Sequence, residues 1–384
     1  MRRAALFLCA CALAVAQRAP VEGAWDLLRR GQHDQAVVVL RKIIQEDARN
    51  ADARLLLGSV LQEDGDREAL ALLREAVLLR PNSAEAHNAL GEALNEFGDA
   101  AAARPEFETA AKLKPGFAQA RVNLGLVLLQ AGQIDAAGAE LDAALQLLPA
   151  GPDAAYPHYL RAKVYTAKDS VENAARELKS AVTLRPDFPE AWSDLGEARK
   201  TLLDSAGALD AFERAGVLNP RDPVIQTRLG SEYFDQGQMS SAVEHLREAV
   251  RQDPKNQTAL YKLQLALRQT HNNSEADAVK RQLAALLLDN DRKAQNALAA
   301  IRVNNQGAAL EKAGDWKGAS EKYRAALKLN PEHVGIRVNL GVVLLRLGNW
   351  DEGMAELRDA ARRDPANAAA QRALKDAVRQ RGLK

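Results

Sequence analysis

Histidines spaced to bind a metal or to transfer protons would be the first sign of catalysis in this chain. A zinc protease needs His-Glu-x-x-His on a helix, a serine hydrolase needs Gly-x-Ser-x-Gly, and nucleotide phosphates need a P-loop. None of these motifs occurs in the 384 residues. The six histidines are scattered, at His33, His87, His158, His245, His271 and His333. We expect no enzyme activity, no cofactor and no metal, and we interpret the histidines as solvated helix-surface residues.

Carboxylates are more numerous, but they follow a structural rhythm rather than a catalytic one. Five aspartates lie where a turn between two helices is predicted: Asp64, Asp66, Asp99, Asp135 and Asp315. A short acceptor at such a turn caps the next helix by accepting from its free N–H groups. We expect these residues to be helix caps and not catalytic pairs.

Prolines recur along the chain at a near-constant interval. Most successive members are 34 residues apart, in the series Pro81, Pro115, Pro149, Pro186, Pro220, Pro254, Pro331 and Pro365. Neither helix nor strand geometry has so long a period, so the interval indicates a duplicated structural unit. The larger gap before Pro331 fits one repeat that has lost its proline and gained nine residues.

Each interval contains two amphipathic helical patterns. In residues 118–151, apolar side chains recur three and four positions apart on both sides of Gly132,. Small residues at Gly125, Ala137 and Ala144 would let two antiparallel helices approach closely. The closing proline cannot continue a helix. The sequence therefore predicts an all-α fold.

This pattern resembles the tetratricopeptide repeat (TPR), whose signature is Trp-x2-Leu-Gly-x2-Tyr, then Ala-x3-Phe, then Ala and Pro. One repeat fills it except for the tyrosine, with Trp192, Leu195, Gly196, Ala208, Phe212, Ala215 and Pro220. The resemblance implies a right-handed α-solenoid of about ten helix-turn-helix repeats, beginning near residues 17, 51, 84, 118, 155, 189, 223, 257, 300 and 334. Residues 368–384 are expected to form a capping helix.

Departures from the pattern divide this array. We assign repeats one to eight to residues 17–290 and repeats nine and ten to residues 300–367. The eighth is degenerate, with Gln264 and His271 in place of both glycines. No Gly or Pro occurs from Lys255 to Gln306, so residues 291–299 are predicted to be a helical insertion, which leaves a bend of the solenoid open,.

The first sixteen residues resemble a signal peptide. Arg2 and Arg3 precede an apolar run that is too short to span a membrane, and Ala16 ends a small-residue cleavage site,. Cleavage there would remove Cys9 and Cys11, the only cysteines. We expect export to a periplasmic or secreted location, without a transmembrane segment. A lipoprotein box around Cys9 or Cys11 would leave a very short apolar run, so a lipid anchor is not expected.

What remains for function is surface. In the family that this chain resembles, the first helices line a concave groove that binds partners. The resemblance places ten residues in that groove: Asn123, Leu126, Tyr156, Tyr159, Asp194, Arg228, Phe234, Tyr261, Asn305 and Asn339. An asparagine can both donate to and accept from a peptide backbone. Local bonding of the asparagines, and packing of the tyrosines between first helices, stay open as alternatives.

The resemblance implies a non-catalytic scaffold that binds a protein or peptide. The alternative is a module that recruits substrates for a separate enzyme, such as a glycosyltransferase or an envelope-assembly machine. The formal net charge of +1 and the lack of clusters combining aromatic and basic residues argue against a nucleic-acid partner,.

Overall fold

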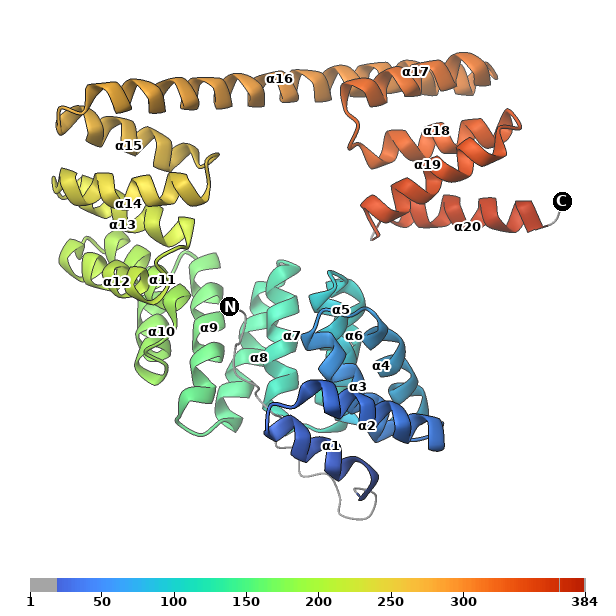
Figure 1. Ribbon diagram of the computed structural model, residues 1–384, viewed down its shortest axis with the longest axis horizontal. Helices are drawn as coiled ribbons and strands as arrows, with labels where there is room; N and C mark the ends of the chain where they lie inside the picture. The colour runs from blue at the N-terminus through green and yellow to red at the C-terminus, as the bar shows by residue number, and fades with distance from the viewer. Residues whose placement is uncertain (1–18, 366, 383–384) are drawn as a thin grey trace. The chain divides into compact units, whose positions relative to one another are not determined.

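The computed structural model of the chain describes residues 19–365 and 367–382, so the predicted signal peptide, residues 1–16, lies outside the described residues. The described residues form twenty α-helices and one short 3₁₀ turn, without a strand (Figure 1). The predicted all-α repeat fold is therefore confirmed. The chain divides into two compact parts, residues 1–238 and 239–384, which are described separately below.

The N-terminal part contains thirteen α-helices among its described residues, and most have thirteen or fourteen residues. Their bounds are α1 Ala19–Arg29, α2 His33–Glu46, α3 Ala51–Glu63, α4 Glu68–Leu79, α5 Ala84–Glu96, α6 Ala100–Leu113, α7 Ala118–Gln130, α8 Ile134–Leu147, α9 Ala155–Ala167, α10 Val171–Leu184, α11 Pro189–Thr201, α12 Ser205–Leu218 and α13 Pro223–Asp235, with the 3₁₀ turn at Pro152–Ala154.

The described residues of the C-terminal part form seven helices. They are α14 Met239–Gln252, α15 Gln257–Gln269, α16 Asn273–Lys312, α17 Trp316–Leu329, α18 Val334–Arg346, α19 Trp350–Arg363 and α20 Ala368–Gly382. Residues 291–299, the predicted helical insertion, lie inside the 40-residue helix α16. Helix α20 packs on α18 and α19. None of the helices described in either part combines the length and hydropathy that a membrane-spanning helix needs.

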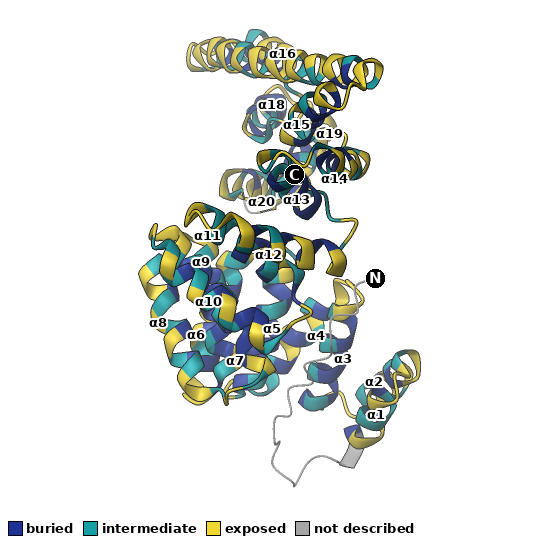
Figure 2. Ribbon diagram, turned by 90° about the vertical axis from the view of Figure 1, so that its left-hand side faces the viewer, coloured by how far each residue is buried: buried dark blue, intermediate teal, exposed yellow. Residues whose placement is uncertain are grey.

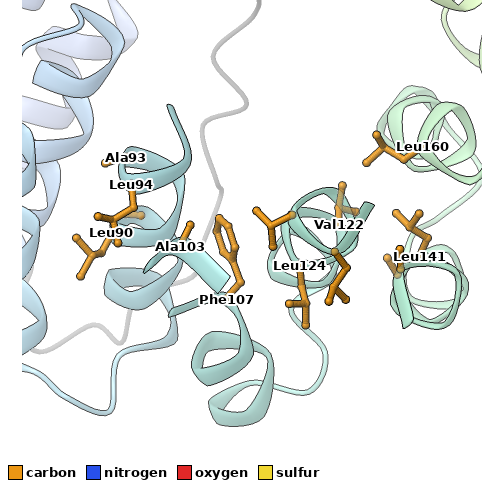
Figure 3. Packing of buried hydrophobic residues seen from close by; sticks show 14 of the residues in the cluster. Leu90, Ala93, Leu94, Ala103, Phe107, Val122, Leu124, Leu141 and Leu160 are labelled. Carbon is orange, nitrogen blue, oxygen red and sulfur yellow. The ribbon is translucent and has the colours of Figure 1, made fainter. Parts of the chain in front are cut away.

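Helices pack in sequence order within each part. A first helix such as α5 packs on α6, its second helix, and α6 packs in turn on α7. Neighbouring first helices, such as α3 and α5 or α5 and α7, also contact each other. Figure 3 shows Leu90, Phe107, Leu124 and Leu141 within one apolar cluster that continues from α5 to α8. The first helices therefore lie in a row.

Glycine ends most first helices because the chain reverses there with a positive φ. Gly132 follows α7 with φ 71°, and Gln133 N–H donates to the Leu128 carbonyl at 2.9 Å. This is the left-handed helix end that glycine adopts without steric cost. Leu203 and His271 hold the equivalent turn with φ 63° and 60°. The degenerate turn at His271 thus keeps its backbone form.

A second set of glycines makes room for one large side chain in each pair. A Cβ on Gly196 would lie 2.5 Å from Phe212 Cε1, and a Cβ on Gly307 would lie 2.7 Å from Tyr323 Cε1. Gly125 meets Leu141 Cγ at 2.8 Å in the same way. The predicted close approach is confirmed. Its main partner is the large residue of the second helix rather than the alanines.

The prolines also have a hydrogen-bonding role. The fourth residue of the next first helix donates to the proline carbonyl six residues before it, as Trp192 Nε1 does to Pro186 O at 2.8 Å. The same contact recurs for Arg121 with Pro115 and for Arg337 with Pro331, at 3.2 and 2.6 Å. This contact fixes the turn between successive pairs, because it satisfies a carbonyl that no helix can use.

The aspartate caps are confirmed in part. Asp99 and Asp315 accept from the N–H groups of Ala102 and Gly318. Asp66 accepts from Glu68 N–H just before α4. Asp64 instead ends α3, and Asp135 lies inside the first turn of α8, where it pairs with Lys168 at 2.6 Å. The cap assignment was wrong for these two because the helices begin and end one or two residues away from the predicted turn.

Candidate protein-binding face of the first helices

Polar side chains join successive first helices in a repeated pattern, which we call the first-helix ladder. Positions are counted from the first residue of each first helix, or from residue 300 within α16. The ladder consists of position 6 of one helix together with positions 5 and 9 of the preceding first helix. Its members are Asn88, Glu92 and Asn123; Lys163, Ser193, Asp194, Glu197 and Arg228; and Asn304 and Asn339.

Asn123 is the buried centre of the ladder between α5 and α7. Its amide nitrogen donates to Asn88 Oδ1 at 3.0 Å and to Glu92 Oε1 at 2.8 Å, and its oxygen accepts from Gln119 Nε2 at 3.0 Å. Both amide hydrogens are therefore committed within the protein. The local-bonding alternative describes this residue, and it leaves little capacity for a peptide backbone.

Charged members form the ladder from α9 to α13. Lys163 Nζ lies 2.6 Å from Asp194 Oδ2, and Arg228 donates to Asp194 Oδ1 at 2.9 Å and to Ser193 Oγ at 2.8 Å. Arg228 also lies 3.5 Å from Glu197. Asp194 is largely buried, whereas Lys163 and Glu197 are exposed by 43 % and 46 %. Two ordered charges of opposite sign thus remain open to a partner.

Tyr156 and Tyr159 lie half-buried on α9 beside this charged row. Their rings stack with centroids 6.2 Å apart, and Tyr159 packs against Phe188 at 4.9 Å. Burial raises the pKa of the Tyr159 hydroxyl, and the charge of Asp194 and a hydrogen bond to it raise the pKa further. The ammonium group of Lys163 lies 5.1 Å from the centre of the Tyr159 ring,. The tyrosines thus pack between first helices and present only their edges.

The other predicted groove residues do not gather at one place. Leu126 is partly buried in the apolar cluster of α5 to α9, and Phe234 is partly buried on α13. In the C-terminal part, Tyr261 is 55 % exposed on α15 and Asn305 is exposed on α16. Asn339 donates to Asn304 at 3.0 Å. Its lack of a second bond to position 9 follows from Ala308, which has no acceptor in its side chain.

The sequence analysis missed the partners at positions 5 and 9. It placed position 9 in the lining, yet it did not pair Glu92, Lys163 or Glu197 with the residue 31 positions later. It also missed Lys200, which lies 2.9 Å from Glu232 and donates to Asp235 at 2.6 Å across α11 and α13. The signal was available, because Lys200 and Asp235 hold positions 12 and 13 of successive first helices.

Two histidines differ from the solvated interpretation. His87 is buried, and its ring nitrogens contact Glu106 Oε2 at 2.6 Å and Pro81 O at 2.9 Å. His158 contacts Glu177 at 2.7 Å. Both hold position 4, where Arg121 and Arg337 make the same carboxylate contact 19 residues later. Among the described residues no group of three His, Cys, Asp or Glu side chains could hold a metal ion.

Glu92 gives the ladder a measurable pH dependence. Burial raises the pKa of its carboxyl and the charge of Glu96 adds to the rise, while hydrogen bonds from Asn123 and Asn88 partly oppose it. The folded state therefore holds this proton more tightly than the unfolded chain, so stability falls as pH rises from the ordinary pKa through the raised one. We expect Glu92→Gln, which keeps an acceptor for Asn123, to raise the Tm by about 2 °C at neutral pH.

The difference between Glu92→Gln and the original chain should vanish in acid, where both side chains are neutral. Thermal unfolding followed by circular dichroism across the pH range measures it. The exposed carboxylate of Glu172 supplies the matched control, since Glu172→Gln should change neither curve. An equal gain at acid and neutral pH would contradict the burial of the Glu92 charge.

Family models match the helical pattern at four places. Two models of the tetratricopeptide repeat match residues 96–155 and 304–368 and residues 27–93, and a TPR-repeat model matches residues 230–269. Together these matches cover more than half of the chain, and they fall on the helix pairs described above. The chain belongs to the tetratricopeptide repeat family. The expected resemblance is thereby confirmed.

Curated TPR relatives match over part of their length. The chain is 26 % identical over 237 residues to a DnaJ homolog subfamily C member 7 homolog of Schizosaccharomyces pombe, which covers 55 % of this chain and 49 % of that protein. It is 30 % identical over 128 residues to the cytochrome c-type biogenesis protein CycH of Pseudomonas aeruginosa, covering 33 % of this chain and 31 % of the relative. The chain thus spans about half or less of these relatives' length.

Solved TPR structures confirm the fold. PilW, a type IV pilus biogenesis factor, matches 56 % of this chain and all of its own at a TM-score of 0.50 and 20 % identity. A tetratricopeptide repeat protein from Parabacteroides merdae matches 65 % of this chain and 98 % of its own, at 0.50 and 14 %. At these identities the likeness shows the helical repeat fold, which is the fold of protein–protein interaction scaffolds.

Proposed function

We propose that this TPR protein is a non-catalytic scaffold that binds a polypeptide on the first-helix face of its N-terminal part. The observation that carries the proposal is the charged section of the ladder, where α9, α11 and α13 hold Lys163, Asp194, Glu197 and Arg228 in one bonded row. The row is ordered before any partner arrives. A partner therefore does not have to bear the entropy cost of fixing these side chains.

The chemistry of the row suits an extended polypeptide with polar side chains. Lys163 offers an exposed ammonium group and Glu197 an exposed carboxylate, while the half-buried ring of Tyr159 lies beside them. Tyrosine supplies a large contact area with a polar edge. Because the two exposed charges have opposite signs, recognition by this face requires a partner with charges of both signs.

Affinity capture from the native source tests this proposal. The variant Lys163→Gln/Glu197→Gln removes the two most exposed charges but leaves the pair between Asp194 and Arg228 intact. Exposed ion pairs contribute about 0.2–1 kcal/mol each to stability, so this variant should stay folded. We expect it to recover at least about tenfold less of the captured polypeptide than the original chain, which corresponds to roughly 1.4 kcal/mol.

The matched control is an exposed ion pair on a second helix. Arg104 Nε contacts Glu108 Oε1 at 2.6 Å on α6, so Arg104→Gln/Glu108→Gln makes the same charge change away from the first-helix face. This control should capture as much polypeptide as the original chain. Loss of capture in the control, with full capture by the ladder variant, would move the binding face to the second helices.

We also propose that the mature scaffold acts in an exported compartment, periplasmic or secreted. The support is the leader pattern of residues 1–16 and the small residue at Ala16,. The intact mass of protein purified from its native source tests it. A chain that begins at Gln17 is expected, and a chain that retains Cys9 and Cys11 would contradict export by cleavage.

A further inference from the structure

The middle of α16 is a bare stretch of helix. Its ends are anchored, because Ala276 and Val279 are buried at one end and Ala300 and Gly307 at the other, where α15 and α17 pack. Between them, no residue from 280 to 299 is buried. Figure 2 shows the exposed colour along most of α16. Forty residues without a break thus carry an unsupported centre of about five turns.

This bare stretch has an apolar stripe along one side. Leu288 is 71 % exposed and Leu298 66 %, and Leu287 and Ile301 are also exposed. The stripe, at spacings of three and four residues, consists of Ala284, Leu287, Asp291, Ala294, Leu298 and Ile301, flanked by Leu288. Such spacing is the pattern of a helix that packs against another helix. Exposed leucines of this number mark an interaction surface.

The charges of the stretch lie away from the stripe and neutralise one another. Asp289 contacts Arg292 and Lys293 at 2.6 Å each, one turn along the same helix. Only Asp291 brings a charge into the stripe, where it accepts from Gln295 at 2.8 Å. The stripe therefore offers a partner apolar contact, interrupted once by a single negative charge.

We propose that this stripe binds the stripe of a second copy of the chain, with the two helices antiparallel. A two-fold axis between Arg292 and Lys293 places Leu287 against Leu298 of the second copy and Ala284 against its Ile301. The larger side chain of that second contact is met by a small one. Asp291 then lies beside Ala294 of the second copy, and no like charges meet at the seam.

Charge selects this orientation over the parallel one. In a parallel pair in register, each Asp291 would face Asp291 of the second copy within an apolar seam. Two like charges close together in a desolvated contact repel strongly. A polar residue at a seam position fixes register and partner in this way. The antiparallel pair also turns the ion pairs of Asp289 to solvent, where they can persist.

The paired length sets the strength of the dimer. Residues 284–301 span about 27 Å of helix. One helix pair of this length falls among interfaces below about 1,200 Å², which are weak and reversible. The dimer should therefore depend on concentration.

Sedimentation equilibrium of the full chain at several concentrations tests the proposal. We expect the mass to rise from one chain toward two, and Leu287→Glu/Leu298→Glu to stay monomeric throughout. Glutamate favours helix, so circular dichroism should be unchanged. The control Arg292→Gln/Lys293→Gln, on the opposite side of α16, should dimerise as before. A monomeric original chain, or a dimer that survives the leucine substitutions, overturns the proposal.

Cysteine pairing tests the register. In a full chain with Cys9→Ser and Cys11→Ser, one preparation carries Leu287→Cys and another Leu298→Cys. Mixed under mild oxidation, the two should form a disulfide-linked heterodimer, while each alone should remain mostly unlinked, since identical positions lie eleven residues apart along the seam. Equal linking of each preparation by itself would show a parallel pair and overturn the antiparallel register.

Discussion

Replacing Phe212 by alanine should lower the free energy of unfolding of the N-terminal part by about 4 kcal/mol. The ring is fully buried between α11 and α12 and packs with Leu229 of α13. Gly196 has no side chain that could expand into the vacated space, and its backbone is held by helix hydrogen bonds. Removing the ring therefore leaves a cavity and also loosens the contact to the next pair.

Urea unfolding followed by circular dichroism measures the loss, and hydrogen exchange shows whether α11 to α13 open first. Leu203→Ala is the control, because Leu203 is 90 % exposed in the turn between the same two helices, and it should change stability by less than about 0.5 kcal/mol,. A Phe212→Ala loss below about 1 kcal/mol would mean that the helices collapse into the space.

Replacing Lys200 by methionine should cost about 2 kcal/mol. Glu232 is only 2 % exposed, and Lys200 is the cation beside it. Burial lowers the pKa of Lys200, but bonds to Asp235 and Glu232 outweigh burial and raise the pKa overall. Breaking a buried pair costs roughly 3–5 kcal/mol, because the remaining charge is uncompensated. Lys200 itself is 36 % exposed, so solvent screening reduces that figure,.

A second substitution separates this explanation from simple loss of packing. Glu232→Gln in the Lys200→Met background should recover most of the loss, since it removes the isolated charge. Thermal or urea unfolding at neutral pH provides the measurement. The control Lys168→Met removes a lysine whose partner, Asp135, is almost fully exposed, and it should cost nothing measurable,. If Glu232→Gln rescues nothing, the charge of Glu232 is not what Lys200 stabilises.

The fold followed from the sequence because each repeat states the same local chemistry again. A glycine with positive φ ends a first helix, a proline follows the second, and glycines such as Gly196 admit large partners such as Phe212. First helices such as α7, α9 and α11 begin at the predicted residues. The absence of Gly and Pro also indicated the continuous helix through residues 291–299.

The candidate site was harder to predict because periodicity places a side chain on a face but does not show whether its hydrogen bonds are already used. Asn123 and Asp194 hold the expected positions, yet their partners come from the preceding first helix. Helix patterns also could not show that Tyr159 would stack on Phe188, which lies in the turn before α11. Such contacts depend on distances between repeats that one repeat does not contain.

The first-helix ladder also makes the repeats unequal neighbours. Position 9 of one first helix must suit position 6 of the next, so Glu92 fits Asn123, and Lys163 fits Asp194. If the repeats were shuffled so that the one with Glu197 preceded the one with Asp194, two carboxylates would meet. The order of the repeats is thus written into the chain as a series of matched joints, and a recombined array would fit together only where those joints still agree.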